Sequence, residues 1–355
     1  TVMASETVVT AHPTRAHHWA ARHPMATFIV LAYTLSTAWF LNYLVDLGAV
    51  NGFGVIGSVS PALAAMVVAA IVKPEPSRST AGKGWQLFGV ASLLTLAIMV
   101  AVRLWAATGL VILPGTDPSV PPYPNLLAVA ADLSAAAAVG LVISGVHSQR
   151  QGVRDLLRSL DPRRADVPWY WWAIALGAYP AFVALGNGLA AAVGLPAPAP
   201  NASGPWHWLT VSALIMFAFC LVGGGGLEEP GWRGLALPLL QKRFSPLRSS
   251  LILGVLWTFW HWPQLLLSGA QGGLPVVVSF FLQVVSLALL FTAVFHLARG
   301  SLLVVVVLHA AINATDLFLS ASALTTIVQL LVALGVALWM WRSPGAFAGD
   351  VTPAP

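Results

Sequence analysis

The 355-residue chain has a single cysteine and few charged side chains. One cysteine, Cys220, cannot form an internal disulfide, and it excludes a metal site built from several thiolates. Its neighbours are apolar, so we interpret it as a packing residue of a helix. Only 8% of the residues are charged, whereas about a quarter are charged in an ordinary soluble domain. The composition therefore excludes a soluble globular protein.

Apolar residues dominate instead, and they occur in long continuous runs. They make up 58% of the chain, which has a mean hydropathy of +0.81. The runs are about 20 residues long, the length that crosses a bilayer as a helix, and they lack the alternation typical of barrel strands. The sequence predicts an all-α, polytopic transmembrane helix bundle of about ten spans, within a range of about eight to ten. The expected spans are residues 25–45, 55–72, 86–112, 125–146, 169–193, 208–226, 249–268, 273–297, 300–319 and 322–341.

Lysine and arginine residues lie almost entirely between these expected spans. Of the 17 basic residues, only Arg103 falls inside a span. With ten spans the others all lie on one side of the membrane, which the positive-inside rule assigns to the cytoplasm. We therefore expect a multi-pass protein of the cell membrane with both termini in the cytoplasm. The lipid bilayer is its expected partner, and nucleic acid is not, because the positive charge follows the topology.

The expected spans leave no stretch long enough for a separate soluble domain. Residues 1–24 are polar and lack the apolar core of a signal peptide, so we expect a flexible cytoplasmic segment. Residues 25–342 then form a single transmembrane domain, followed by a flexible tail over 343–355. Residues 147–168 alternate leucines with arginines in a pattern that predicts an amphipathic helix on the inner leaflet.

Two adjacent carboxylates and an arginine interrupt the apolar sequence in GLEEPGWRG, residues 226–234. A charged residue near the bilayer core costs about 2.5–3.5 kcal/mol, so it usually serves a function. Glu229 and Arg233 are four residues apart and can pair on one helix face. That pairing leaves Glu228 free to act. The alternative is that both glutamates form an interfacial ion pair with Arg233.

Two further polar positions lie in apolar runs downstream. His261 lies about 20 Å from the basic start of its expected helix, among tryptophans. His309 and Asn313 are four residues apart and share a helix face. Each alone could be a hydrogen-bonding residue between helices. Together with the carboxylates they favour hydrolysis, because a carboxylate beside an imidazole can activate water, while a second imidazole and an amide can stabilise an oxyanion.

Two other readings of the polar residues stay open. Glu228, His261 and His309 could bind zinc, although the sequence has no His-Glu-x-x-His motif. We expect no cofactor, with zinc as the alternative. A transporter could use Glu228, Asp132 or Arg103 as its coupling charge. Asp132 and Arg103 could equally pair with each other between neighbouring spans.

Three motifs in separate apolar regions resemble those of a known family. They are Glu228-Glu229-x-x-x-Arg233, Trp257-x-x-x-His261 and His309-x-x-x-Asn313. In this order they are similar to the motifs of the CPBP family, the CAAX-processing and bacteriocin-processing intramembrane proteases, also called Abi or Rce1-type. The resemblance covers about residues 205–320. The family usually has phenylalanine where Trp257 stands.

The resemblance implies an intramembrane endopeptidase that hydrolyses membrane-associated or peptide substrates without a metal. It implies Glu228 as the base that activates water, with help from His261. His309 and Asn313 would stabilise the oxyanion. Two residues would support them, Glu229 and Arg233. The alternative is a non-catalytic bacteriocin-immunity or partner-binding membrane protein on the same scaffold.

Overall fold

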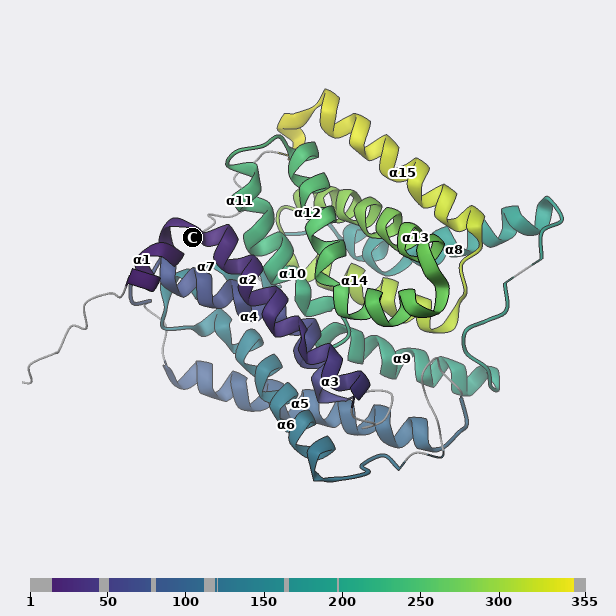
Figure 1. The fold of residues 1–355 in the computed structure, drawn as a ribbon, viewed down its shortest axis with the longest axis horizontal. Helices are drawn as coiled ribbons and strands as arrows, with labels where there is room; N and C mark the ends of the chain where they lie inside the picture. Colours follow the sequence, from purple (N-terminus) through teal and green to yellow (C-terminus); the bar gives the residue numbers. More distant parts are fainter. Residues whose placement is uncertain are drawn as a thin grey trace, which may run out of the picture.

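A computed structural model of the protein describes residues 15–44, 51–77, 81–111, 119, 121–162, 166–196 and 198–347. This part of the chain is a bundle of helices without a strand (Figure 1). Eight of its helical stretches are long and apolar enough to cross a membrane, and one further apolar helix is shorter. The predicted all-α polytopic bundle is therefore confirmed.

The first part of the bundle contains seven α-helices. They are α1 (Arg15–Arg22), α2 (Pro24–Ser36), α3 (Ala38–Leu44), α4 (Gly52–Val72), α5 (Ala81–Ala107), α6 (Leu126–Ser144) and α7 (Gln151–Leu157). The second part holds α8 (Trp169–Ala192), α9 (Trp206–Val222), α10 (Glu229–Gly231), α11 (Leu237–Gln241), α12 (Pro246–Trp260), α13 (Trp262–Leu297), α14 (Leu302–Phe318) and α15 (Ala323–Arg342).

Short helical turns join several of these helices. They are η1 (Gly145–His147), η2 (Arg158–Leu160), η3 (Gly226–Glu228), the π-helical η4 (Trp232–Ala236) and η5 (Pro344–Phe347). All ten expected spans correspond to a helix or to parts of neighbouring helices. The expected gap after residue 268 lies inside α13, where Gly273 leaves helical geometry with a φ of 66°.

The two ends of the described chain differ from the expected flexible segments. Within 1–24, Arg15–Arg22 forms α1, which packs against α4, while residues 1–14 lie outside the described residues. At the other end Phe347 is fully buried, and its ring packs edge-on to Trp339 with centroids 4.8 Å apart. The start of the expected tail is therefore part of the packed structure, and residues 348–355 lie outside the described part.

Helix α4 occupies the centre of the first half and packs against α2, α3, α6 and α7. Its buried face consists largely of Ala, Gly, Ser and Val, and such small residues let neighbouring helices approach closely. The same face receives α10, because a Cβ added to Gly231 would lie 2.5 Å from the backbone of Pro61. Helix α4 thus forms the support on which the carboxylate motif rests.

The structure corrects the expectation that the amphipathic segment, which contains α7, lies on the lipid of the inner leaflet. Val153, Leu156 and Leu157 do lie on one face, but that face is buried inside the protein. A Cβ added to Gly152 would lie 2.1 Å from the carbonyl oxygen of Ala69 on α4. The apolar face therefore packs on α4 and not on the lipid, because glycine lets the two helices approach closely.

Arg103 and Asp132 form a buried ion pair between α5 and α6. Two nitrogens of the arginine lie 2.7 Å and 2.9 Å from the two carboxylate oxygens. The backbone N–H of Gly52 donates to the same carboxylate at 2.9 Å, and the guanidinium lies over the ring of Tyr123. Both charges have fixed partners, which matches the predicted pairing of Asp132 with Arg103.

Candidate active site

The carboxylate motif follows a break in the helical stretch that begins at Trp206. After α9 the chain makes a glycine turn and continues through η3, α10, η4 and α11. The 36-residue apolar stretch runs from Trp206 to Gln241, and residues 225–237 are all buried. The expected end of this span at residue 226 corresponds to the end of α9 at Val222, where Gly223 is the C-cap. The glycines turn the chain, and Glu228 follows in the short helices that continue to Gln241.

Gly225 brings this turn against the third motif on α14. Its φ of 112° is open to glycine and strained for other residues. A Cβ at this position would lie 2.3 Å from Nδ2 of Asn313 and 2.8 Å from Nε2 of His309. The amide of Asn313 also donates to the carbonyl oxygen of Gly224 at 2.7 Å. The turn and α14 therefore fit together only with glycine at residue 225.

Glu229 is held by two partners and is completely buried. Its Oε2 lies 3.0 Å from Nη1 of Arg233, and its Oε1 lies 2.7 Å from Nδ1 of His309. The predicted pair of Glu229 and Arg233 thus forms. The guanidinium lies 4.5 Å from the ring centroids of both Trp257 and Phe291, which gives the cation aromatic faces in place of water.

The contact with Glu229 fixes the orientation of the His309 ring. A carboxylate oxygen accepts a hydrogen bond, so Nδ1 of His309 carries a proton and donates it. The second ring nitrogen, Nε2, is then the atom left for other chemistry. Because Glu229 is tied to both Arg233 and His309, it acts as an anchor between η4 and α14.

Glu228 has different surroundings from its neighbour, although it is also buried at 3% exposure. The indole N–H of Trp257 donates to its Oε2 at 2.8 Å. Glu228 lines a cavity, whereas Glu229 does not. The structure therefore separates the two adjacent carboxylates in the way that their spacing predicted.

His261 lies at the junction of α12 and α13, where the helix changes direction. Its Nδ1 lies 2.7 Å from the carbonyl oxygen of Trp257, so that nitrogen carries the proton in the neutral ring. Nε2 of His261 is then free to accept a proton. The ring stacks on Trp39 of α3 with centroids 5.8 Å apart and planes inclined by 18°. Phe280 packs against its other side at 5.1 Å.

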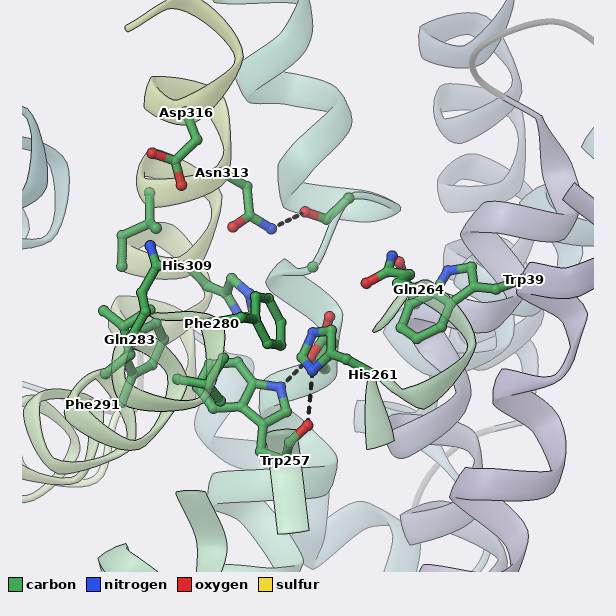
Figure 2. Close-up of a pocket in the computed structure, with 17 residues that line it drawn as sticks. Trp39, Trp257, His261, Gln264, Phe280, Gln283, Phe291, His309, Asn313 and Asp316 are labelled. Atoms are coloured by element: carbon green, nitrogen blue, oxygen red, sulfur yellow. Dashed lines mark hydrogen bonds between the residues drawn. The ribbon is translucent and has the colours of Figure 1, made fainter. Parts of the chain in front are cut away.

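A cavity of about 310 Å³ collects the polar side chains from these elements (Figure 2). Glu228, His261, His309 and Asn313 all line it, and Arg233 lies behind it with Glu229. Figure 2 shows His309 and Asn313 pointing from one helix toward the side of the cavity where His261 lies. The fold therefore brings all the predicted site residues together, while their catalytic roles stay predictions.

The cavity also contains polar residues that the motifs did not indicate. Asp316 follows Asn313 by three residues on α14, and its Oδ1 accepts a hydrogen bond from the hydroxyl of Tyr179 at 2.7 Å. The shared helix face of residues 309, 313 and 316 was a signal that could have found it. Gln264 and Gln283 also line the cavity, and no spacing in the sequence links them to the motifs.

The alternative zinc site is not assembled in this structure. Within the described ranges, no group of three or more His, Cys, Asp or Glu side chains is close enough to hold a metal ion. Nδ1 of His261 and Nδ1 of His309 both have protein partners, and one oxygen of Glu228 is held by an indole. Such partners on one ring nitrogen are also usual for metal-bound histidines, so the expectation of no cofactor, with zinc as the alternative, stays a prediction.

Comparisons with known proteins point to the same family as the motifs. Residues 210–315 match a family model described as type II CAAX prenyl endopeptidase Rce1-like. A segment of 131 residues is 27% identical to CAAX prenyl protease 2 of Methanococcus maripaludis, and covers 34% of this chain and 48% of that protein. The chain thus spans about half the length of this relative. The matched range contains all three motifs, so the segment that forms the site is similar to the Rce1-type (CPBP) family.

Proposed function

We propose that the protein is an intramembrane endopeptidase that hydrolyses peptide bonds with a water activated by Glu228. One observation carries the proposal. Of the two adjacent carboxylates, only Glu228 faces the cavity, and both histidines and Asn313 line the same cavity. The similarity to the Rce1-like endopeptidase family and to CAAX prenyl protease 2 of Methanococcus maripaludis supports a peptidase.

In the proposed reaction, a substrate carbonyl enters the cavity beside a water molecule. Glu228 takes a proton from the water, with His261 Nε2 as a second acceptor, and the resulting hydroxide attacks the carbonyl carbon. The C–N bond then breaks. The amine leaves with the proton that Glu228 held, and the new carboxyl group keeps the hydroxyl. The net change is the addition of one water across the peptide bond.

The attacked carbonyl oxygen becomes negatively charged and needs hydrogen-bond donors. One N–H of Asn313 is used by Gly224, and its amide has a second N–H to donate. His309 donates from Nε2 when that nitrogen also carries a proton, and the carboxylate of Glu229 at Nδ1 balances the charge of the ring. Preorganised donors of this kind often contribute about 100- to 1,000-fold in rate.

Glu229 and Arg233 act as positioning residues in this proposal. Neither lines the cavity, and each is completely buried. The carboxylate holds His309 in one orientation, while the guanidinium balances the carboxylate's charge. We propose a multi-pass cell-membrane protein with cytoplasmic termini, whose substrates are membrane-associated or peptide chains that can reach this buried cavity.

The decisive experiment compares Glu228→Gln with a matched carboxylate change in the same cavity. Comparative proteomics of protein N-termini, in membranes that hold wild-type or Glu228→Gln protein, first identifies a cleaved substrate. With the purified protein we then expect kcat for that substrate to fall about 100- to 10,000-fold in Glu228→Gln. Asp316→Asn, the control, should lower it far less, because its carboxylate is used by Tyr179.

Wild-type rates in Glu228→Gln would reject the mechanism. A protective or partner-binding phenotype that survives the same substitution would favour the non-catalytic alternative. Activity that is lost on thorough chelation and restored by zinc would replace the metal-free mechanism with the metal-dependent one.

A further inference from the structure

A second cavity, of about 650 Å³, lies at the basic end of the bundle, away from the candidate active site. It is bounded by the start of α2, the end of α4 at Val72, and the turn that joins α11 to α12. The proposed reaction uses none of the residues that line it. We call this cavity the basic groove.

The basic groove has a cationic part and an apolar part. Its cations are Arg22, Lys242 and Arg243, and no carboxylate lines it. Among the residues that the structure describes, none pairs with these three side chains, and all three are exposed. Three neighbouring cations without a counter-charge favour an anionic ligand.

The apolar part of the groove decides the chemical class of that ligand. Met25 and Ile29 of α2 line it beside the aromatic ring of Phe244, which is 41% exposed. A small soluble anion would satisfy the cations and leave this surface uncovered. An amphiphile with a phosphate head and an acyl chain satisfies both parts.

We propose that the basic groove binds an anionic phospholipid. Its phosphate lies among Arg22, Lys242 and Arg243, and an acyl chain lies along Met25 and Ile29. The groove suits this occupant by position as well, because it opens where apolar helices end and basic residues begin. The inference does not depend on the proposed peptidase activity.

Native mass spectrometry tests the proposal. The full chain in detergent is mixed with equal amounts of phosphatidylglycerol and phosphatidylcholine, and the lipid that stays bound is identified. We expect the wild-type protein to retain phosphatidylglycerol preferentially. Lys242→Gln with Arg243→Gln should weaken this retention about tenfold, through the loss of two cations near the phosphate. The matched control, Lys83→Gln with Arg342→Gln, removes the same charge from exposed positions outside the groove and should retain the lipid as the wild type does.

Two further arms separate a lipid from a soluble anion. Phe244→Ser should weaken retention of phosphatidylglycerol, because it removes part of the apolar surface. Millimolar inorganic phosphate should not displace the lipid. Equal retention by both double variants would overturn the proposal, and so would complete displacement by inorganic phosphate, which would assign the groove to a soluble anion.

Discussion

Trp257 contacts several of the predicted site residues at once. Its indole N–H donates to Glu228, and its carbonyl oxygen accepts from His261. Its ring lies against the guanidinium of Arg233 and packs edge-on to His309, with ring centroids 5.4 Å apart. Phenylalanine, which the resembled family usually has at this position, would keep the carbonyl and the ring contacts but could not donate to Glu228.

We predict that Trp257→Phe lowers kcat about tenfold or more, because the hydrogen bond to a charged oxygen that orients Glu228 is lost. The pH profile of kcat/KM should also change, since the indole N–H contacts the proposed base directly. Trp260→Phe is the control, because its indole donates to the carbonyl oxygen of Ala32 outside the cavity. An unchanged kcat and pH profile in Trp257→Phe would show that the indole N–H does not position the base.

Gly225 gives a second prediction at the residue scale. An alanine there would collide with Asn313 and His309 and strain the backbone, so we expect Gly225→Ala to abolish most of the activity. Gly223→Ala is the matched control in the same turn, because the atoms nearest to its added Cβ belong to the side chain of Val55, from 2.9 Å, and not to the site residues. The predicted difference is checked by measuring kcat and the melting temperature of both purified variants. Equal activities would argue against the close fit.

The break before the carboxylate motif shows how packing adds to a prediction made from sequence. Four consecutive glycines, residues 223–226, are poor helix formers, and the expected span ends there. In the structure, α9 ends at Val222, and Pro230 lies in the first turn of α10, where its missing N–H is harmless. Packing against α4 and α14 holds the motif inside the bundle.

The attachment of α7 to α4 depends on a carboxylate outside the spans. Burial would raise the pKa of Asp155, but hydrogen bonds from Lys73 and Gln151 outweigh it and hold the pKa below its ordinary value. A lowered pKa in the folded state means that the ionised carboxylate stabilises the fold. That contribution is present above the ordinary pKa of about 4 and is lost as the pH falls below it.

We therefore predict that Asp155→Asn lowers the melting temperature at pH 7 by about 1–2 °C, as expected for a loss of roughly 1 kcal/mol in a protein of 355 residues. The difference from wild type should shrink as the pH is lowered through the pKa of the carboxylate. Asp166→Asn is the control, because that carboxylate is fully exposed in its pair with Arg299. A difference that stays constant down to pH 3 would contradict the role of ionisation.

At the scale of the whole molecule, the site depends on parts of the chain that are far apart in sequence. Trp39 from α3 stacks on His261 from the α12–α13 junction, and the glycine turn meets α14. Helices α5 and α6 lie along one side of the bundle and α15 along the opposite side (Figure 1). The candidate active site therefore lies among these helices, while the basic groove is lined by the start of α2, the end of α4 and the turn between α11 and α12.

The orientation of the whole bundle can be measured with single cysteines. Cys220 is 2% exposed, so the natural thiol should give little background labelling. We predict that a membrane-impermeant thiol reagent added to intact cells labels Ser203→Cys but not Ser343→Cys. Both positions are exposed and lie on opposite sides of the expected topology. The reverse pattern would invert the topology, and labelling of both would reject it.

The sequence by itself determined the class of fold, the approximate spans and the resemblance to one family. Long apolar runs can be satisfied only as helices in lipid, and Glu228, His261 and His309 are conspicuous because polar groups are costly there. The pairing of Glu229 with Arg233 also followed from the sequence, since a spacing of four places both on one helix face.

Only the tertiary structure decided which surfaces meet. It placed His309 on Glu229, the indole of Trp257 on Glu228, and α7 on the protein instead of the lipid. These contacts join segments whose separation along the chain carries no periodic signal. Their physical basis is close approach at glycines and the need of each buried polar group for a partner, and both depend on the packed arrangement of all the helices.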